Sequence, residues 1–132
     1  MEYRVTARRI DGHGSVALAK EAEVALDTDP AGRRDAMNPV ELLLSALAAC
    51  MLKGIERMIP MLQMQIDGAE VSLTAVRQDA PPKLVAISYE IVVDSPETEQ
   101  RLNLLHRNVL KYGTISNTLS LAVPIEGVLR RI

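Results

Sequence analysis

The fold is decided by the stretch NPVELLLSALAACML at residues 38–52, which predicts a buried central helix. Asn38 is a favourable N-cap, Pro39 suits the first helical position, and Glu41 stands three residues after the cap, as in a capping box. Within the helical part of this stretch only Glu41 and Ser45 are polar, so nearly the whole circumference is apolar. A helix of this kind is buried on all sides.

The helix is expected to run from Pro39 to about Met58 or beyond, with Pro60 kinking or ending it because proline removes a backbone donor. A membrane span needs roughly 20 apolar residues. Lys53 and Glu56 come too early for that length, so the pattern indicates a core helix. One sheet covers only one side of such a helix. The remaining surface is therefore expected to meet a second helix and another subunit, which predicts an intimate homodimer.

The flanking segments show the alternation of apolar and polar residues that is typical of strands. Strands are expected at residues 2–9, through Val16 and Leu18, at Glu23–Leu26, at Glu70–Arg77, at Lys83–Asp94 and around Leu121, Val123 and Ile125. The two strands between residues 70 and 94 are expected to form an antiparallel hairpin. Residues 27–38 read as a polar loop, and a loop of this length in a small domain is either mobile or functional.

A second helix is expected after Ser95, which would cap it, with Pro96 in its first position and an apolar stripe at Leu102, Leu105 and Val109. The resulting order βββ-α-ββ-α-β predicts an α+β fold in which helices pack against an antiparallel sheet. The length of 132 residues predicts one domain, residues 1–132.

Composition excludes several functions. The net charge is −2 with no basic stripe, and only three tyrosines supply aromatic rings, so nucleic acid is not an expected partner. Cys50 is the only cysteine, which rules out an internal disulfide and a cysteine-based metal cluster. We expect no cofactor and no bound metal. The N-terminal residues lack the pattern of a signal peptide, so a cytoplasmic protein without membrane association is expected.

Cys50 and Glu41 are the first candidates for chemistry. Taken alone, Cys50 is better explained as a small buried apolar residue, because a reactive thiolate needs a nearby cation or hydrogen-bond donors. Glu41 precedes it by nine residues, which places the two side chains on opposite sides of the helix and about 13 Å apart along its axis. A capping role is therefore the favoured interpretation of Glu41.

Other candidates are cationic. Four arginines of the N-terminal strand and the polar loop are able to reach an interface and lower the pKa of a thiol there, although each is also explained as a solvated surface charge: Arg8, Arg9, Arg33 and Arg34. His13 and His106 have no partners at the spacing of a metal site or a catalytic triad, so both are interpreted as unspecialised.

Two segments together resemble the OsmC/Ohr family. Residues 38–50 look like the family's Asn-Pro-x-Glu-Leu-Leu stretch and the alanine-rich run that leads to its peroxidatic cysteine. Residues 112–119, YGTISNTL, are close to the family's Cys-x-Val/Ile-Ser-Asn-Thr-Leu segment. The resemblance implies an OsmC-like fold and an intertwined homodimer with two active sites at the subunit interface.

The resemblance also implies roles for single residues. Cys50 matches the peroxidatic cysteine, which attacks the O–O bond of a hydroperoxide and becomes a sulfenic acid. Gly113 stands where the family has the resolving cysteine that captures this acid as a disulfide. The ordinary two-cysteine mechanism therefore cannot operate in this chain.

The assisting residues of the family match less completely. Val40 falls where the Ohr-type members have their glutamate, and Glu41 matches the neighbouring acidic position of more divergent relatives. Arg9 or Arg8 corresponds to the family's N-terminal arginine. The catalytic set implied by the resemblance is thus Cys50, Arg9 and Glu41.

Two functions remain open at this point. One is a one-cysteine hydroperoxide reductase in oxidative stress defence, in which an external thiol recycles Cys50. The other is a non-catalytic homodimer that binds a small apolar ligand at its interface, which the neutral residues Val40 and Gly113 favour. Whether the chain is an enzyme is left open by the sequence.

Overall fold

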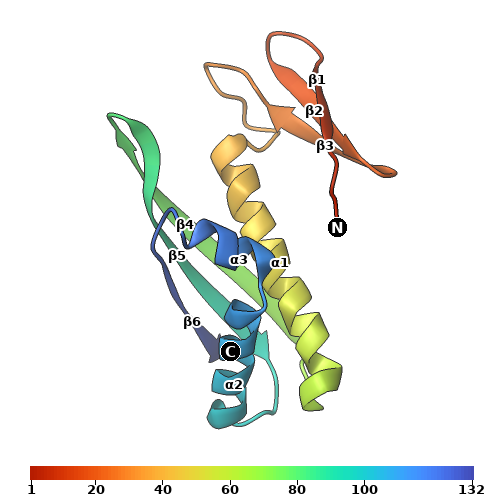
Figure 1. Ribbon diagram of the computed structural model, residues 1–132, viewed down its shortest axis with the longest axis vertical. Coiled ribbons are helices and arrows are strands. Elements are labelled where there is room, and N and C mark those ends of the chain that lie inside the picture. Colours follow the sequence, from red (N-terminus) through yellow and green to blue (C-terminus); the bar gives the residue numbers. More distant parts are fainter. The chain divides into compact units, whose positions relative to one another are not determined.

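Two three-stranded sheets organise the chain in the computed structural model, which describes residues 1–132 (Figure 1). The contacts between residues divide the chain into two compact units, Met1–Leu43 and Leu44–Ile132. The first unit holds the antiparallel strands β1 (Thr6–Arg9), β2 (Gly14–Ala19) and β3 (Ala22–Asp27), in that order. The strand expected at Glu23–Leu26 is therefore confirmed as β3, whereas β1 begins four residues later than the strand expected at residues 2–9.

The polar loop after β3 is held together by the carboxylate of Asp27, which is 6% exposed. Its two oxygens accept hydrogen bonds from the backbone N–H groups of Asp29, at 3.1 Å, and Arg33, at 3.0 Å. The backbone N–H of Asp27 donates to the carbonyl of Met37 at 2.9 Å. The side chain of Asp27 thus holds the first part of the loop, and its backbone N–H holds the end at Met37.

Helix α1 (Pro39–Leu62) follows and begins as the sequence predicts. The N–H of Asn38 donates to Glu41 Oε1 at 3.0 Å, and the N–H of Glu41 donates to Asn38 Oδ1 at 2.9 Å. These reciprocal bonds form the capping box. Pro60 lies inside the last turn, and the helix ends two residues after it.

One face of α1 is buried in the second unit, and its residues recur every three or four positions as expected for an amphipathic helix. The buried residues are Leu47, Met51, Gly54, Ile55 and Met58. The other face carries Ala46, Ala49 and Leu52, which are exposed. Burial on all sides, as the sequence predicts, is therefore not achieved within a single chain.

The second unit contains β4 (Gly68–Asp79), β5 (Pro82–Asp94) and β6 (Ile125–Arg131). The pairing of β4 with β5 is antiparallel, as predicted. β6 pairs with β5 in parallel, because the chain crosses back over the sheet through two helices before it enters the last strand. The expectation of a wholly antiparallel sheet is therefore wrong at this pair. The last strand also begins at Ile125 rather than near Leu121, which is 90% exposed in a turn.

Helix α2 (Glu99–Lys111) is capped by Thr98. The prediction from the sequence that Ser95 caps it is therefore wrong. The Thr98 side chain accepts the N–H of Arg101 at 3.2 Å, whereas Ser95 Oγ donates to the carbonyl of Gln65 at 2.7 Å. A short helix that the sequence did not predict, α3 (Thr114–Leu119), follows. The helices α1 and α2 and the inner face of β5 share one hydrophobic core (Figure 1). The α+β class is thereby confirmed.

The capping box gives a prediction for Glu41. Glu41→Ala removes the side-chain acceptor for the N–H of Asn38 and is expected to lower the free energy of unfolding by about 1 kcal/mol. Glu41→Gln keeps a side-chain oxygen at that place, and its free energy of unfolding is expected to stay within about 0.3 kcal/mol of the wild-type value. Chemical denaturation of the three proteins measures this. Equal stability of the alanine and wild-type proteins would show that the capping bonds contribute nothing.

Candidate active site

Cys50 lies where α1 crosses the end of α2. Gly54, one turn further along α1, makes this crossing close: a Cβ atom at Gly54 would lie 3.4 Å from the Val109 side chain and 3.5 Å from its Cα. At the same crossing, Cys50 faces Gly113, the residue that joins α2 to α3. The thiol is therefore held at a contact between two helices that small residues allow to approach.

Gly113 directly adjoins the thiol. A Cβ atom built at Gly113 would lie 3.3 Å from Cys50 Sγ. The backbone of Gly113 has φ −83° and ψ 112°, a conformation that any residue adopts. The structure thus brings together the two positions that the resemblance paired, a peroxidatic cysteine and the place of a resolving one. The two positions are neighbours in the fold, and only the first of them carries a thiol.

Ser116 is a third member of this group, and sequence reasoning did not single it out. Its Oγ would lie 2.7 Å from the same Cβ position at Gly113, and the carbonyl oxygen of Val109 would lie 3.0 Å from it. Ser116 is 6% exposed and its hydroxyl has no hydrogen-bond partner. The only signal in the sequence was its place three residues after Gly113 in the segment 112–119.

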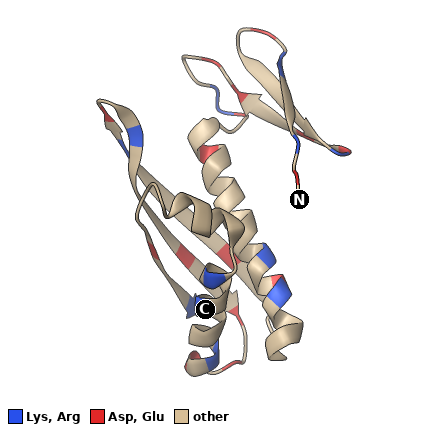
Figure 2. Ribbon diagram, in the orientation of Figure 1, with Lys and Arg blue, Asp and Glu red and all other residues tan.

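Formal charges are absent from the helix around the thiol. Between Glu41 and Lys53 helix α1 has no acidic or basic residue, and this stretch is tan in Figure 2.

Two turns after Cys50, Arg57 donates from Nη1 to the carbonyl oxygen of Tyr112 at 3.3 Å. This arginine therefore ties α1 to the peptide group that precedes Gly113.

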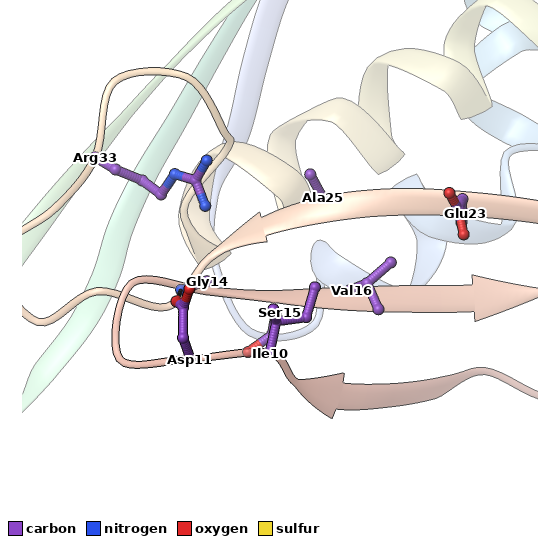
Figure 3. Close-up of a pocket in the computed structure, with 8 residues that line it drawn as sticks. All are labelled: Ile10, Asp11, Gly14, Ser15, Val16, Glu23, Ala25 and Arg33. Atoms are coloured by element: carbon purple, nitrogen blue, oxygen red, sulfur yellow. Dashed lines mark hydrogen bonds between the residues drawn. The ribbon is translucent and has the colours of Figure 1, made fainter.

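The predicted cationic partners belong to the first unit. Arg33 forms two bonds to Asp35, from Nε at 2.6 Å and from Nη2 at 2.8 Å, and this pairing lowers the pKa of Asp35 to about 2. Figure 3 shows the Arg33 guanidinium directed toward Gly14 at the edge of a pocket of about 360 Å³. Arg8 and Arg9 are exposed on β1, and their side chains form no ion pair.

The two histidines have structural partners that the sequence did not reveal. His106 Nε2 lies 2.5 Å from the Tyr89 hydroxyl, with the two rings edge to face, and burial lowers the pKa of His106. His13 Nδ1 lies 2.7 Å from Asp29 Oδ2, and this bond raises the pKa of His13. No cluster of three or more histidine, cysteine or acidic side chains is arranged to hold a metal ion.

Comparisons with known proteins agree with this picture. The family model for "OsmC-like protein" matches residues 15–127. An OsmC-like protein from Mycoplasma pneumoniae superposes with a TM-score of 0.91 at 24% identity, over 100% of this chain and 98% of that one. An organic hydroperoxide resistance protein from Elizabethkingia anophelis gives a TM-score of 0.78 at 13% identity, over 100% and 99%. No curated protein matches the sequence.

A further structural neighbour is the organic hydroperoxide resistance protein OhrB of Bacillus subtilis, with a TM-score of 0.68 at 17% identity over 98% of both chains. The fold and the site define an α+β protein whose only thiol lies at a helix crossing, opposite a glycine. The chain belongs to the family of OsmC-like proteins. None of its helices is both long enough and apolar enough to span a bilayer.

The position of Gly113 gives a prediction that concerns geometry alone. Gly113→Cys is expected to form a disulfide with Cys50 under mild oxidation, because the new Cβ lies 3.3 Å from Sγ and the backbone conformation is permitted. Closing this loop is expected to raise the free energy of unfolding of the oxidised protein over the reduced one by up to about 4 kcal/mol. Mass spectrometry and denaturation in the presence and absence of reductant measure both effects.

Gly113→Ala is the matched control, since it adds the same crowding against Ser116 Oγ and the Val109 carbonyl without a thiol. Its stability is expected not to depend on reductant. If Gly113→Cys stayed reduced while it folded normally, the proximity of the two positions would be refuted.

Proposed function

We propose that the chain is a one-cysteine thiol peroxidase that reduces organic hydroperoxides in oxidative stress defence. The observation that carries the proposal is the placement of Cys50 Sγ against Gly113 at the helix crossing, in a chain of the OsmC-like family. Organic hydroperoxide resistance proteins among the structural neighbours support the choice of substrate class.

The reaction begins with the thiolate of Cys50. The sulfur attacks the terminal oxygen of the hydroperoxide, the O–O bond breaks, and the alkoxide leaves and takes up a proton to become an alcohol. Sulfur has then lost two electrons and Cys50 is a sulfenic acid. An external thiol attacks this sulfur, water leaves, and a mixed disulfide forms. A second external thiol attacks the mixed disulfide, which releases Cys50 and an oxidised disulfide product.

The need for an external thiol follows from position 113. Cys50 is the only cysteine, so no second thiol of the same chain can reach its sulfenic acid in a fold that offers Gly113 at that place. Without external thiol, further peroxide would oxidise the sulfenic acid to sulfinic acid. The reductant therefore determines whether the reaction is catalytic or stops after one turnover.

Arg9 and Glu41 complete the proposed site. Arg9 is a free cation on β1 and would hold the thiolate or the departing alkoxide. Glu41 would orient that arginine, in addition to its capping bonds with Asn38. Glu41→Gln separates the two roles, because it retains the cap and removes the charge.

A homodimer is part of the proposal. The exposed face of α1 carries Ala46, Ala49 and Leu52, and a helix with apolar residues on this face is stabilised when another surface covers it. Every residue of β1 is exposed in the single chain, and Val5, Ile10 and Val24 are 66%, 64% and 45% exposed. A second copy of the chain is the partner we infer for both apolar surfaces.

A non-catalytic dimer that binds a small apolar ligand is the second candidate. The uncharged stretch of α1 from Leu42 to Leu52 favours it, because a thiolate is stabilised by a cation and no charged residue lies in this stretch. The two candidates differ in what happens to the sulfur. Only the peroxidase requires Cys50 to be oxidised and reduced in a cycle.

The enzymatic proposal is tested by hydroperoxide consumption. With cumene hydroperoxide and an excess of dithiothreitol, the wild-type protein is expected to consume peroxide over many turnovers, whereas Cys50→Ser is expected to fall to the rate of the uncatalysed reaction. Arg9→Met and Glu41→Gln are expected to lower kcat/KM by about tenfold or more, since the first removes the charge that holds the thiolate or the alkoxide and the second removes the charge that orients this arginine.

Arg4→Met is the matched control for Arg9, because Arg4 is exposed and lies outside β1. It is expected to leave the rate unchanged. If Cys50 of the wild type stayed unoxidised in the mass spectrum after exposure to cumene hydroperoxide, the peroxidase would be rejected and the ligand-binding dimer preferred. A small apolar molecule copurified with the protein would support that second candidate.

The dimer is tested separately by sedimentation. The wild-type protein is expected to sediment with the mass of two chains at low micromolar concentration. Ala49→Arg places a charge on the exposed apolar face of α1 and is expected to shift the protein to the mass of one chain or to weaken association by at least tenfold. Glu99→Gln, an exposed change at the start of α2 and away from this face, serves as the control. A monomeric wild type would contradict this part of the proposal.

A further inference from the structure

The hydroxyl of Ser116 is buried and has no hydrogen-bond partner. A hydroxyl in this state destabilises a fold, because it has lost its bonds to water and gained none. Neighbouring hydroxyls behave differently: Thr118 Oγ1 donates to the carbonyl of Thr114 at 2.8 Å, and Ser120 Oγ donates to that of Asn117 at 3.2 Å. A hydrogen-bond partner that the chain itself does not supply would offset the free energy lost by burying the Ser116 hydroxyl.

Three groups of different chemistry surround one point in front of Gly113. Cys50 Sγ would lie 3.3 Å from a Cβ atom placed there, Ser116 Oγ 2.7 Å and the carbonyl oxygen of Val109 3.0 Å. They are a nucleophile, a hydrogen-bond donor and a hydrogen-bond acceptor. Since residue 113 has no side chain, no Cβ atom occupies this point.

We propose that the Ser116 hydroxyl donates a hydrogen bond to the oxygen that Cys50 takes from a hydroperoxide. Sγ and Ser116 Oγ both lie within 3.3 Å of this point, so an oxygen bonded to Sγ on the side that faces Gly113 approaches the Ser116 hydroxyl. The proton of the sulfenic acid is then available to the carbonyl of Val109. This inference rests on the proposed function and assigns Ser116 to the same site.

The consequence concerns how long the sulfenic acid survives. Overoxidation proceeds when the deprotonated sulfenate attacks a second hydroperoxide, whose O–O bond breaks to give a sulfinate and an alcohol. The carbonyl of Val109 holds the proton of the sulfenic acid and favours its neutral form, and the bond from Ser116 draws electron density from the oxygen. Both effects make the sulfur less nucleophilic. In a chain without a resolving cysteine, this protection spans the interval until an external thiol arrives.

The inference is tested with the full chain by following the sulfenic acid over time. An excess of cumene hydroperoxide is added without reductant, so that oxidant remains for overoxidation, and a 1,3-diketone that traps sulfenic acids is added after increasing delays. Mass spectrometry then gives the trapped and the overoxidised fractions. Ser116→Ala is expected to shorten the lifetime of the trappable form about tenfold, the effect of a single hydrogen bond to a polar reacting group.

Two further variants serve as controls. Ser116→Thr keeps the hydroxyl and is expected to retain most of the lifetime. Ser120→Ala removes an exposed hydroxyl one residue after α3 and is expected to behave like the wild type. The thermal midpoint of reduced Ser116→Ala is expected to equal or exceed that of the wild type, because no existing bond is lost. A lower midpoint would overturn the inference, since the hydroxyl would then stabilise the reduced fold itself.

Failure of the inference and failure of the proposed function are distinguishable. If cumene hydroperoxide leaves wild-type Cys50 unoxidised, the proposed peroxidase fails. The sulfenic acid is then produced by a short pulse of excess hydrogen peroxide, and the lifetimes of wild type and Ser116→Ala are compared as before. Equal lifetimes overturn the role of Ser116 under either oxidant, whereas a shorter lifetime in the alanine variant supports it.

Discussion

The site depends on the close approach of α1 to the end of α2. Gly54 lies at this approach: a Cβ atom there would already be in van der Waals contact with the side chain and the Cα of Val109. Once the two helices are this close, the thiol of Cys50 has only the junction between α2 and α3 in front of it. The packing therefore determines the chemistry that is available: the sulfur meets a glycine, a backbone carbonyl and a serine hydroxyl.

The same helix contact explains why the residues around Cys50 keep their arrangement although residue 113 is glycine and not cysteine. Gly113 has an ordinary extended conformation, so the backbone does not require glycine there. The crowding by Ser116 Oγ and the Val109 carbonyl disfavours a larger residue in the present arrangement. The absence of a side chain at residue 113 leaves Cys50 without a neighbouring second thiol, so in the proposed reaction its recycling depends on a thiol from outside.

Much of the fold could be predicted from the sequence, because its signals are local. The cap at Asn38 and Glu41 and the alternation between residues 70 and 94 depend on neighbours in the chain, and the structure contains both. The parallel pairing of β6 was not predictable from alternation, since apolar and polar residues alternate in either direction of pairing. The start of α2 was misplaced because both Ser95 and Thr98 are suitable caps, and a tertiary bond to the carbonyl of Gln65 occupies Ser95.

The site itself was predictable only in part. Cys50 and Gly113 were recognisable from two sequence segments, but their proximity is a product of helix packing between residues that are distant in the chain. Ser116 gave no signal beyond its place in the segment 112–119, because a serine near a helix start usually has a local role and burial without a partner is visible only in three dimensions. Arg9 and Glu41 belong to the unit Met1–Leu43, whereas Cys50 belongs to Leu44–Ile132. Their contribution to the proposed site depends on the proposed dimer, which local sequence patterns do not determine.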